Sequence, residues 1–156
     1  MFLRPTERVS RNLQAPAASS EAVRCRMRAT KRRGTKAELR LHQALDNLGL
    51  RYATDKPAIP SILSRADLLF RSAQVAVFVD GCFWHQCPVH GTSPKTNRAW
   101  WTEKLKANRR RDTRNRRRLR EAGWSVLRIW EHAALRSPEQ AARAIANHVK
   151  RRLTIG

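Results

Sequence analysis

The chain has 156 residues, which is enough for one domain around one hydrophobic core. It carries 33 lysine and arginine residues against 12 aspartate and glutamate residues, and the formal net charge of +21 predicts a polyanionic partner. The longest apolar run, residues 75–79, is too short to span a membrane, and three cysteines do not suit a secreted disulfide framework.

Residues 1–20 show no sustained periodicity, so we expect a mobile N-terminal arm followed by one domain over residues 21–156. The amino terminus also lacks the apolar segment of a secretory signal, which predicts a cytoplasmic protein. Thr35 and Glu38 fit a capping box at the start of a helix over residues 36–48.

The remaining elements follow from apolar spacing and turn signals. Two strands are predicted over residues 67–70 and 74–80, joined as a hairpin. A long basic helix over residues 97–122 and a strand over residues 124–130 follow, and a last helix begins at Ser137. This order of helices and strands predicts one layered α/β domain.

A candidate metal site lies between residues 82 and 90, where two of the three cysteines and two of the five histidines occur. Thiolates and imidazoles at short spacing select Zn²⁺, and structural zinc sites close with four ligands. Cys82, Cys87 and His90 supply three, and His132, directly after a predicted strand, is the best candidate for the fourth. The alternative is two buried thiols and two loop histidines.

Three acidic residues stand out in so basic a chain. Asp67 begins one predicted strand, Asp80 ends the next, and Asp112 lies among ten basic residues of the long helix. Carboxylates at strand ends beside a basic surface suit metal-dependent cleavage of phosphodiesters. Each also has a structural interpretation, as a turn residue, a strand-end cap and an ion-pair partner respectively, and the residues alone leave both interpretations open.

The chain contains RADLLF, then VFVDGCFWHQCPVHG, then WWTEKLKANRRRD and GWSVLRIWEH, and GCFWH with the following Cys and His cluster is the most specific of these motifs. From about residue 24 to residue 150 they resemble, in matching order, the motifs of the very short patch repair family of DNA mismatch endonucleases. The resemblance implies an α/β fold of the restriction-endonuclease-like type, a single domain with a central mixed β-sheet flanked by helices and one structural Zn²⁺.

The resemblance also implies catalytic roles for individual residues. Asp67 would hold a catalytic Mg²⁺ with help from the backbone carbonyl of the residue before Gly81, and Glu38 is the helix carboxylate associated with that metal. His85 would act as general acid or base, with Asp112 orienting it. The residue before Gly81, Asp80, stands where some family members have a histidine, and it is a further catalytic candidate.

DNA contacts are expected from aromatic and basic side chains. The aromatic residues that the family wedges into the duplex correspond to Phe83, Trp84 and Trp101, although core packing is their alternative. Arg109 and Arg110 of the long helix are expected to contact phosphates.

The resemblance predicts an Mg²⁺-dependent endonuclease that nicks one strand next to a T:G mismatch and so starts very short patch repair. Its expected partners are mismatched double-stranded DNA and other mismatch-repair proteins, and we expect a monomer associated with the nucleoid. Two alternatives stay open. One is a restriction-type or structure-specific nuclease of the same fold, and the other is a noncatalytic zinc-containing DNA-binding module.

Overall fold

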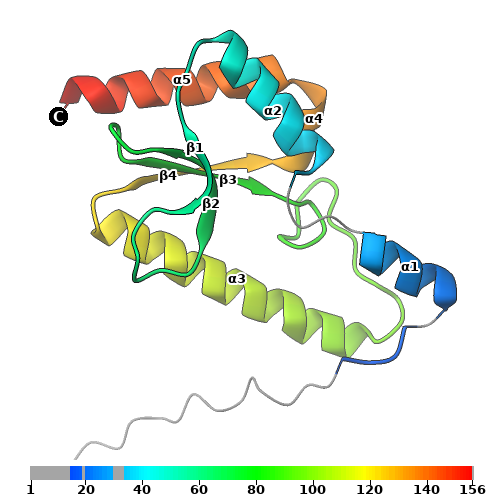
Figure 1. Cartoon of the computed structure of the whole chain (residues 1–156). Helices are drawn as coiled ribbons and strands as arrows, with labels where there is room; N and C mark the ends of the chain where they lie inside the picture. The colour runs from blue at the N-terminus through cyan, green and yellow to red at the C-terminus, as the bar shows by residue number, and fades with distance from the viewer. Residues whose placement is uncertain (1–14, 19, 30–33, 156) are drawn as a thin grey trace, which may run out of the picture.

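The structure, a computed structural model, describes residues 15–18, 20–29 and 34–155. Most of the predicted N-terminal arm, residues 1–20, lies outside these described residues. A helix that was not predicted, α1 (Glu21–Ala29), begins directly after it (Figure 1). Apolar and basic residues alternate along this segment, and such alternation does not indicate a helix.

A four-stranded mixed sheet forms the centre of the described chain, in the order β1 (Ala53–Pro57), β2 (Arg65–Phe70), β3 (Val75–Asp80) and β4 (Ser125–Trp130). β1 pairs with β2 and β2 with β3 in antiparallel fashion, whereas β3 and β4 are parallel. The expectation of a mixed sheet in one α/β domain is therefore confirmed. Parallel pairing brings the ends of β3 and β4 to one edge, where Asp80 lies opposite Trp130.

Helices cover both faces of this sheet. α2 (Lys36–Asn47), α4 (Glu131–Arg136) and α5 (Pro138–Ile155) lie on one face, and the long α3 (Arg98–Glu121) crosses the other (Figure 1). Each face has its own cluster of buried apolar side chains. The first cluster includes Leu41, Leu45, Leu68, Val77 and Ile145, and the second includes Ile62, Leu69, Leu119 and Trp124.

The start of α2 is the predicted capping box. Thr35 Oγ1 accepts a hydrogen bond from the backbone N–H of Glu38 at 3.3 Å, and Glu38 Oε2 accepts one from the N–H of Gly34 at 2.9 Å. Gly49, with φ of 69°, follows the end of this helix, as expected for a residue in the left-handed region. No helix among the described residues is long and apolar enough to cross a membrane.

Some elements differ from the predictions. The edge strand β1 was missed because ATDKP has no apolar alternation and ends in proline, and α4 has six residues, too few to show a period. β2 begins at Arg65, so Asp67 lies within this strand. Trp124 is buried, whereas Trp130 is partly exposed, with Arg128 5.3 Å from its ring centre.

Candidate functional site

Asp67 occupies a break in the ladder between β2 and β3. The backbone pairing of these strands covers Leu68 to Phe70, and beyond it the Asp67 carboxylate accepts a hydrogen bond from Val79 N–H at 2.6 Å. Burial raises the pKa of this carboxyl to about 6, even though the bond from Val79 acts in the opposite direction. A partly buried carboxylate at the end of the β2–β3 pairing is thus held by a backbone hydrogen bond.

Three further acidic residues surround Asp67. The charges of Glu38, Asp80 and Asp55 each contribute to its raised pKa. Glu38 is also engaged by the α2 cap, because its Oε1 accepts a hydrogen bond from the Thr35 hydroxyl at 3.0 Å. Asp55 and Asp80 are paired with Arg65 and Arg128, so arginines already offset part of the negative charge near Asp67.

His85 lies between two carboxylates. Its Nδ1 is 3.1 Å from Asp112 Oδ2, and its Nε2 is 3.7 Å from Asp80 Oδ1. Asp80, only 4% exposed, also accepts a hydrogen bond from Arg128 Nε. Among the described residues, no hydrogen bond or ion pair joins His85 to Asp67. Asp80 acts on both, because it lies 3.7 Å from His85 Nε2 and its charge raises the pKa of Asp67.

Asp112 is ionised in this arrangement. Burial alone would raise the pKa of its carboxyl, but the contact with His85 and the charges of Arg111 and Arg116 hold this pKa below its ordinary value. An ionised carboxylate beside Nδ1 favours the histidine form that carries a proton on that nitrogen. The other ring nitrogen, Nε2, is then available for proton transfer.

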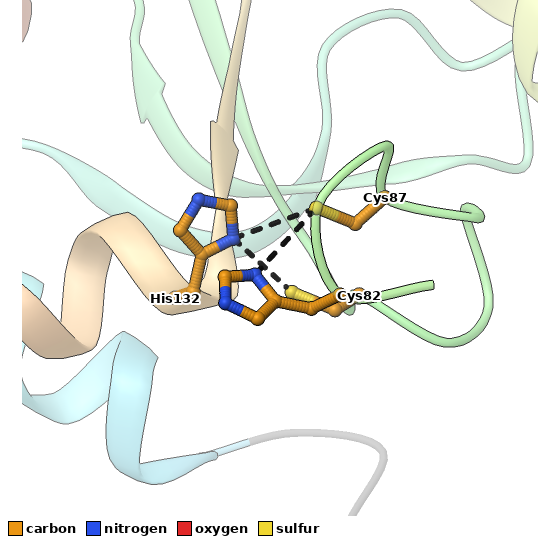
Figure 2. Close-up of side chains that lie close together, drawn as sticks. Cys82, Cys87 and His132 are labelled. Carbon is orange, nitrogen blue, oxygen red and sulfur yellow. Dashed lines mark hydrogen bonds between the residues drawn. The ribbon is translucent and has the colours of Figure 1, made fainter. Parts of the chain in front are cut away.

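The four predicted metal ligands converge at the same end of the sheet. One ligand atom from each of Cys82, Cys87, His90 and His132 lies within 4.8 Å of all the others, so these four side chains could hold a metal ion together. Figure 2 shows both sulfurs, from the loop after β3, facing His132 at the start of α4, with dashed lines for the S···N contacts. Cys82 Sγ and Cys87 Sγ lie 3.3 and 3.6 Å from His132 Nδ1, and Cys87 Sγ lies 3.9 Å from His90 Nδ1.

Two neighbours hold this loop in place. Gly91 N–H donates to the Cys87 carbonyl at 2.7 Å, and a Cβ at position 91 would come within 2.5 Å of that same oxygen. Glu131 Oε2 accepts from the Cys82 N–H at 3.3 Å, which ties the loop to the start of α4. Such supporting contacts orient metal ligands.

The predicted aromatic residues form one partly exposed cluster. The ring centre of Phe83 lies 5.0 Å from that of Trp84 and 5.4 Å from that of Trp101, so the loop after β3 meets the first turn of α3 here. Trp100, a fourth member, packs edge-on to Trp101 at 4.9 Å. Trp84 is 37% exposed, and the other three rings are partly exposed.

Basic residues extend along α3 from the aromatic cluster. Arg109 and Arg110 are exposed, as expected, and they line a groove together with Thr113, Arg114 and Arg117. Arg109 also donates to the Gln86 side chain at 2.9 Å, which connects this helix to the loop of metal ligands.

Three residues around the site were missed by the sequence reasoning. Asp55 lies on the unpredicted strand β1, and Arg128 lies in a strand whose pattern assigns it no function. Glu131 directly precedes the proposed ligand His132, but no motif includes it. No sequence signal indicates Arg128, because only the parallel pairing of β3 with β4 places it near the end of β3.

Comparisons with known proteins agree with the motifs. The family model described as DNA mismatch endonuclease Vsr matches residues 18–90. The type II nicking enzyme V.NaeI of Lentzea aerocolonigenes is 42% identical over 126 residues, which cover 80% of this chain and 76% of that protein. V.NmeDIP of Neisseria meningitidis serogroup C is 37% identical over 80% of this chain and 83% of its own length. DNA mismatch endonuclease Vsr of Escherichia coli K12 is 37% identical over 73% of this chain and 71% of its own length.

Proposed function

Since this chain belongs to the DNA mismatch endonuclease Vsr family and is a DNA endonuclease, we propose that it nicks one strand of a duplex next to a T:G mismatch in an Mg²⁺-dependent reaction. The observation that carries the proposal is the position of His85 between Asp112 and Asp80, with the charge of Asp80 also acting on the partly buried carboxylate of Asp67. The noncatalytic alternative is set aside, because the relatives are named as endonucleases and nicking enzymes.

Asp67 is the proposed Mg²⁺ ligand. Its oxygen chemistry fits a hard cation, and the negative charges around it that raise its pKa would be offset by a divalent ion. The backbone carbonyl of Asp80 is the proposed second ligand, and Glu38, which is held by the α2 cap, contributes through its charge. Bound Mg²⁺ would supply an activated water and neutralise the charge that develops on the phosphate.

His85 is the proposed general acid or base. Asp112 Oδ2 lies 3.1 Å from Nδ1, where it would orient the ring, so that Nε2 exchanges the proton. Asp80 lies on the Nε2 side, where it can stabilise a protonated ring. Asp80 stands where some family members have a histidine, and its proposed role in this chain is electrostatic.

Zinc is the proposed structural metal. In a tetrahedral zinc site with ordinary bond lengths, sulfur and nitrogen ligands lie about 3.6 Å apart. The three S···N distances run from 3.3 to 3.9 Å, which fits that value. All these ligand atoms are thiolate or imidazole, the donors that zinc prefers.

The direct test of the chemistry uses a T:G duplex labelled on each strand. With Mg²⁺ the protein should produce one nick in one strand, and without added divalent metal it should produce none. Equal cleavage of both strands, or full cleavage without added Mg²⁺, would contradict the proposal.

Nicking should depend on pH through Asp67. The pKa of this carboxyl is raised to about 6, so it is mostly protonated below that pH, and a proton competes with the metal. The rate at low Mg²⁺ should fall about tenfold for each pH unit below the pKa. Raising the Mg²⁺ concentration should move the midpoint of this profile to lower pH, because metal displaces the proton. A midpoint that does not change with the Mg²⁺ concentration would show that Asp67 is not the Mg²⁺ ligand.

The aromatic cluster is proposed to wedge into the duplex at the mismatch. Stacking of one base on an aromatic side chain contributes about 1–3 kcal/mol, and a mismatched step is easier to open than a paired one. Trp84→Ala should therefore weaken binding to T:G duplex by about tenfold or more, with a smaller effect on matched duplex. Leu153→Ala, which removes an exposed apolar side chain from α5, is the control. Equal losses on both duplexes would argue against a wedge.

A further inference from the structure

A second feature of the site is lined by His85 and by residues of α3 and β4. It is a cavity of about 250 Å³ whose lining includes Arg109, Arg116, Arg128, Asp112 and Trp130. Arg109 and Arg116 are seven residues apart and share one face of α3. That face meets β4, whereas the other arginines of the helix do not line this cavity.

The three guanidinium groups are held by neighbouring side chains. Arg109 donates to Gln86 Oε1 at 2.9 Å, Arg116 donates to Thr113 Oγ1 at 3.2 Å, and Arg128 donates through Nε to Asp80. A guanidinium has five N–H donors, so each group retains others for a ligand. Preorganised donors of this kind lose little conformational entropy on binding.

The charges in the cavity do not balance. Burial lowers the pKa of Arg116, and the charge of Arg128 lowers it further, despite the opposing effects of Asp80 and Asp112. These two carboxylates already interact with Arg128 and His85. An anion between Arg116 and Arg128 would relieve this repulsion.

We propose that this cavity binds one backbone phosphate of the nicked DNA strand, next to the phosphate that is cut. This inference rests on the proposed function, which supplies DNA as the polyanion. Planar guanidinium groups match phosphate oxygens in geometry and charge. A phosphate held beside His85 would fix the register of the strand against the general acid or base, which is the positioning role of backbone contacts.

The test is a binding scan without Mg²⁺, so that no DNA is cut. Methylphosphonates, which lack the phosphate charge, replace one phosphate at a time around the mismatch of a T:G duplex. Wild-type protein should lose about tenfold in affinity at one position that adjoins the nick. Arg116→Gln should bind the unmodified duplex about tenfold more weakly than wild type, and the methylphosphonate at that position should cause no further loss.

Arg117→Gln is the matched control, because it removes the same charge from the same helix but lies outside this cavity, paired with Glu121. Arg117→Gln should bind the unmodified duplex more weakly than wild type. The methylphosphonate that lowers the affinity of wild-type protein should lower the affinity of this variant as well. Arg116→Lys, which retains charge but not the planar fork, should fall between Arg116→Gln and wild type. Since Arg116 is partly exposed and faces another cation, its replacement should not lower the unfolding temperature, which thermal denaturation checks.

An Arg116→Gln profile that equals the wild-type profile at every position would overturn the cavity proposal while leaving the proposed function intact. If wild-type protein binds no T:G duplex at all, the proposed function fails, and this inference fails with it.

Discussion

Replacing Asp67 with asparagine should reduce the rate of Mg²⁺-dependent nicking by at least about a thousandfold, because metal catalysis of this kind contributes several kcal/mol to transition-state stabilisation. Asparagine has nearly the same shape and can still accept the hydrogen bond from Val79, but it lacks the charge that holds the cation. Single-turnover nicking of T:G duplex measures this loss. Glu139→Gln, an exposed change in the first turn of α5, is the control and should retain full activity.

The same substitution should stabilise the fold at neutral pH. The carboxyl of Asp67 has a pKa of about 6 in the folded chain, against 3.8 for an unperturbed aspartate, so folding favours its protonated form. The stabilisation from that proton is complete below the lower value and is lost as the pH rises through about 6. Asparagine removes the charge, so at pH 7 and without Mg²⁺ the variant should gain about 1–2 kcal/mol in free energy of unfolding. If the Asp67→Asn protein folds and still nicks at the wild-type rate in Mg²⁺, this result would contradict the assignment of Asp67 as the Mg²⁺ ligand.

Replacing Cys87 with alanine should release the structural metal and destabilise the fold. The sulfur is nearly buried and contacts two of the other proposed ligands. Loss of a structural zinc removes binding free energy from folding, here roughly 3 kcal/mol or more, which corresponds to about 10 °C in unfolding temperature for a chain of this length. Zinc per chain, from elemental analysis, and thermal denaturation measure the two effects.

Cys25→Ala is the matched control, because Cys25 is exposed in α1 and lies outside the metal cluster. It should retain one zinc per chain and the wild-type unfolding temperature. His132→Ala should lower the zinc content in the same way as Cys87→Ala. Unchanged zinc content in both Cys87→Ala and His132→Ala would show that these residues hold no metal.

Local sequence signals predicted the parts of the fold that depend on neighbouring residues. The capping box of Thr35 and Glu38 and the long helix α3 have signatures within a few residues, and the structure confirms both. The edge strand β1 has no such signature. Its polar residues do not predict a strand, and it forms one because it pairs with β2.

The candidate site also combines residues that local sequence signals predict with contacts that depend on the fold. The convergence of Cys82, Cys87 and His90 followed from spacing, and His132 followed from its place at a strand end. The contact of Asp80 with Arg128 joins residues 48 positions apart, and it depends on the parallel pairing of β3 and β4, which no local pattern predicts. The family resemblance is confirmed by the comparisons, whereas the catalytic roles taken from it stay predictions.

The most direct measurement of the central claim compares initial nicking rates of wild-type protein, with Mg²⁺, on otherwise identical duplexes. These duplexes carry a T:G pair, another mismatch or a matched pair at one position, with both strands labelled so that each nick is mapped. We predict one nick beside the T:G pair, in one strand, at a rate at least roughly tenfold above that of the matched duplex, because an unpaired step is easier to open. Equal cutting of the matched duplex would contradict this and favour a nuclease with another substrate.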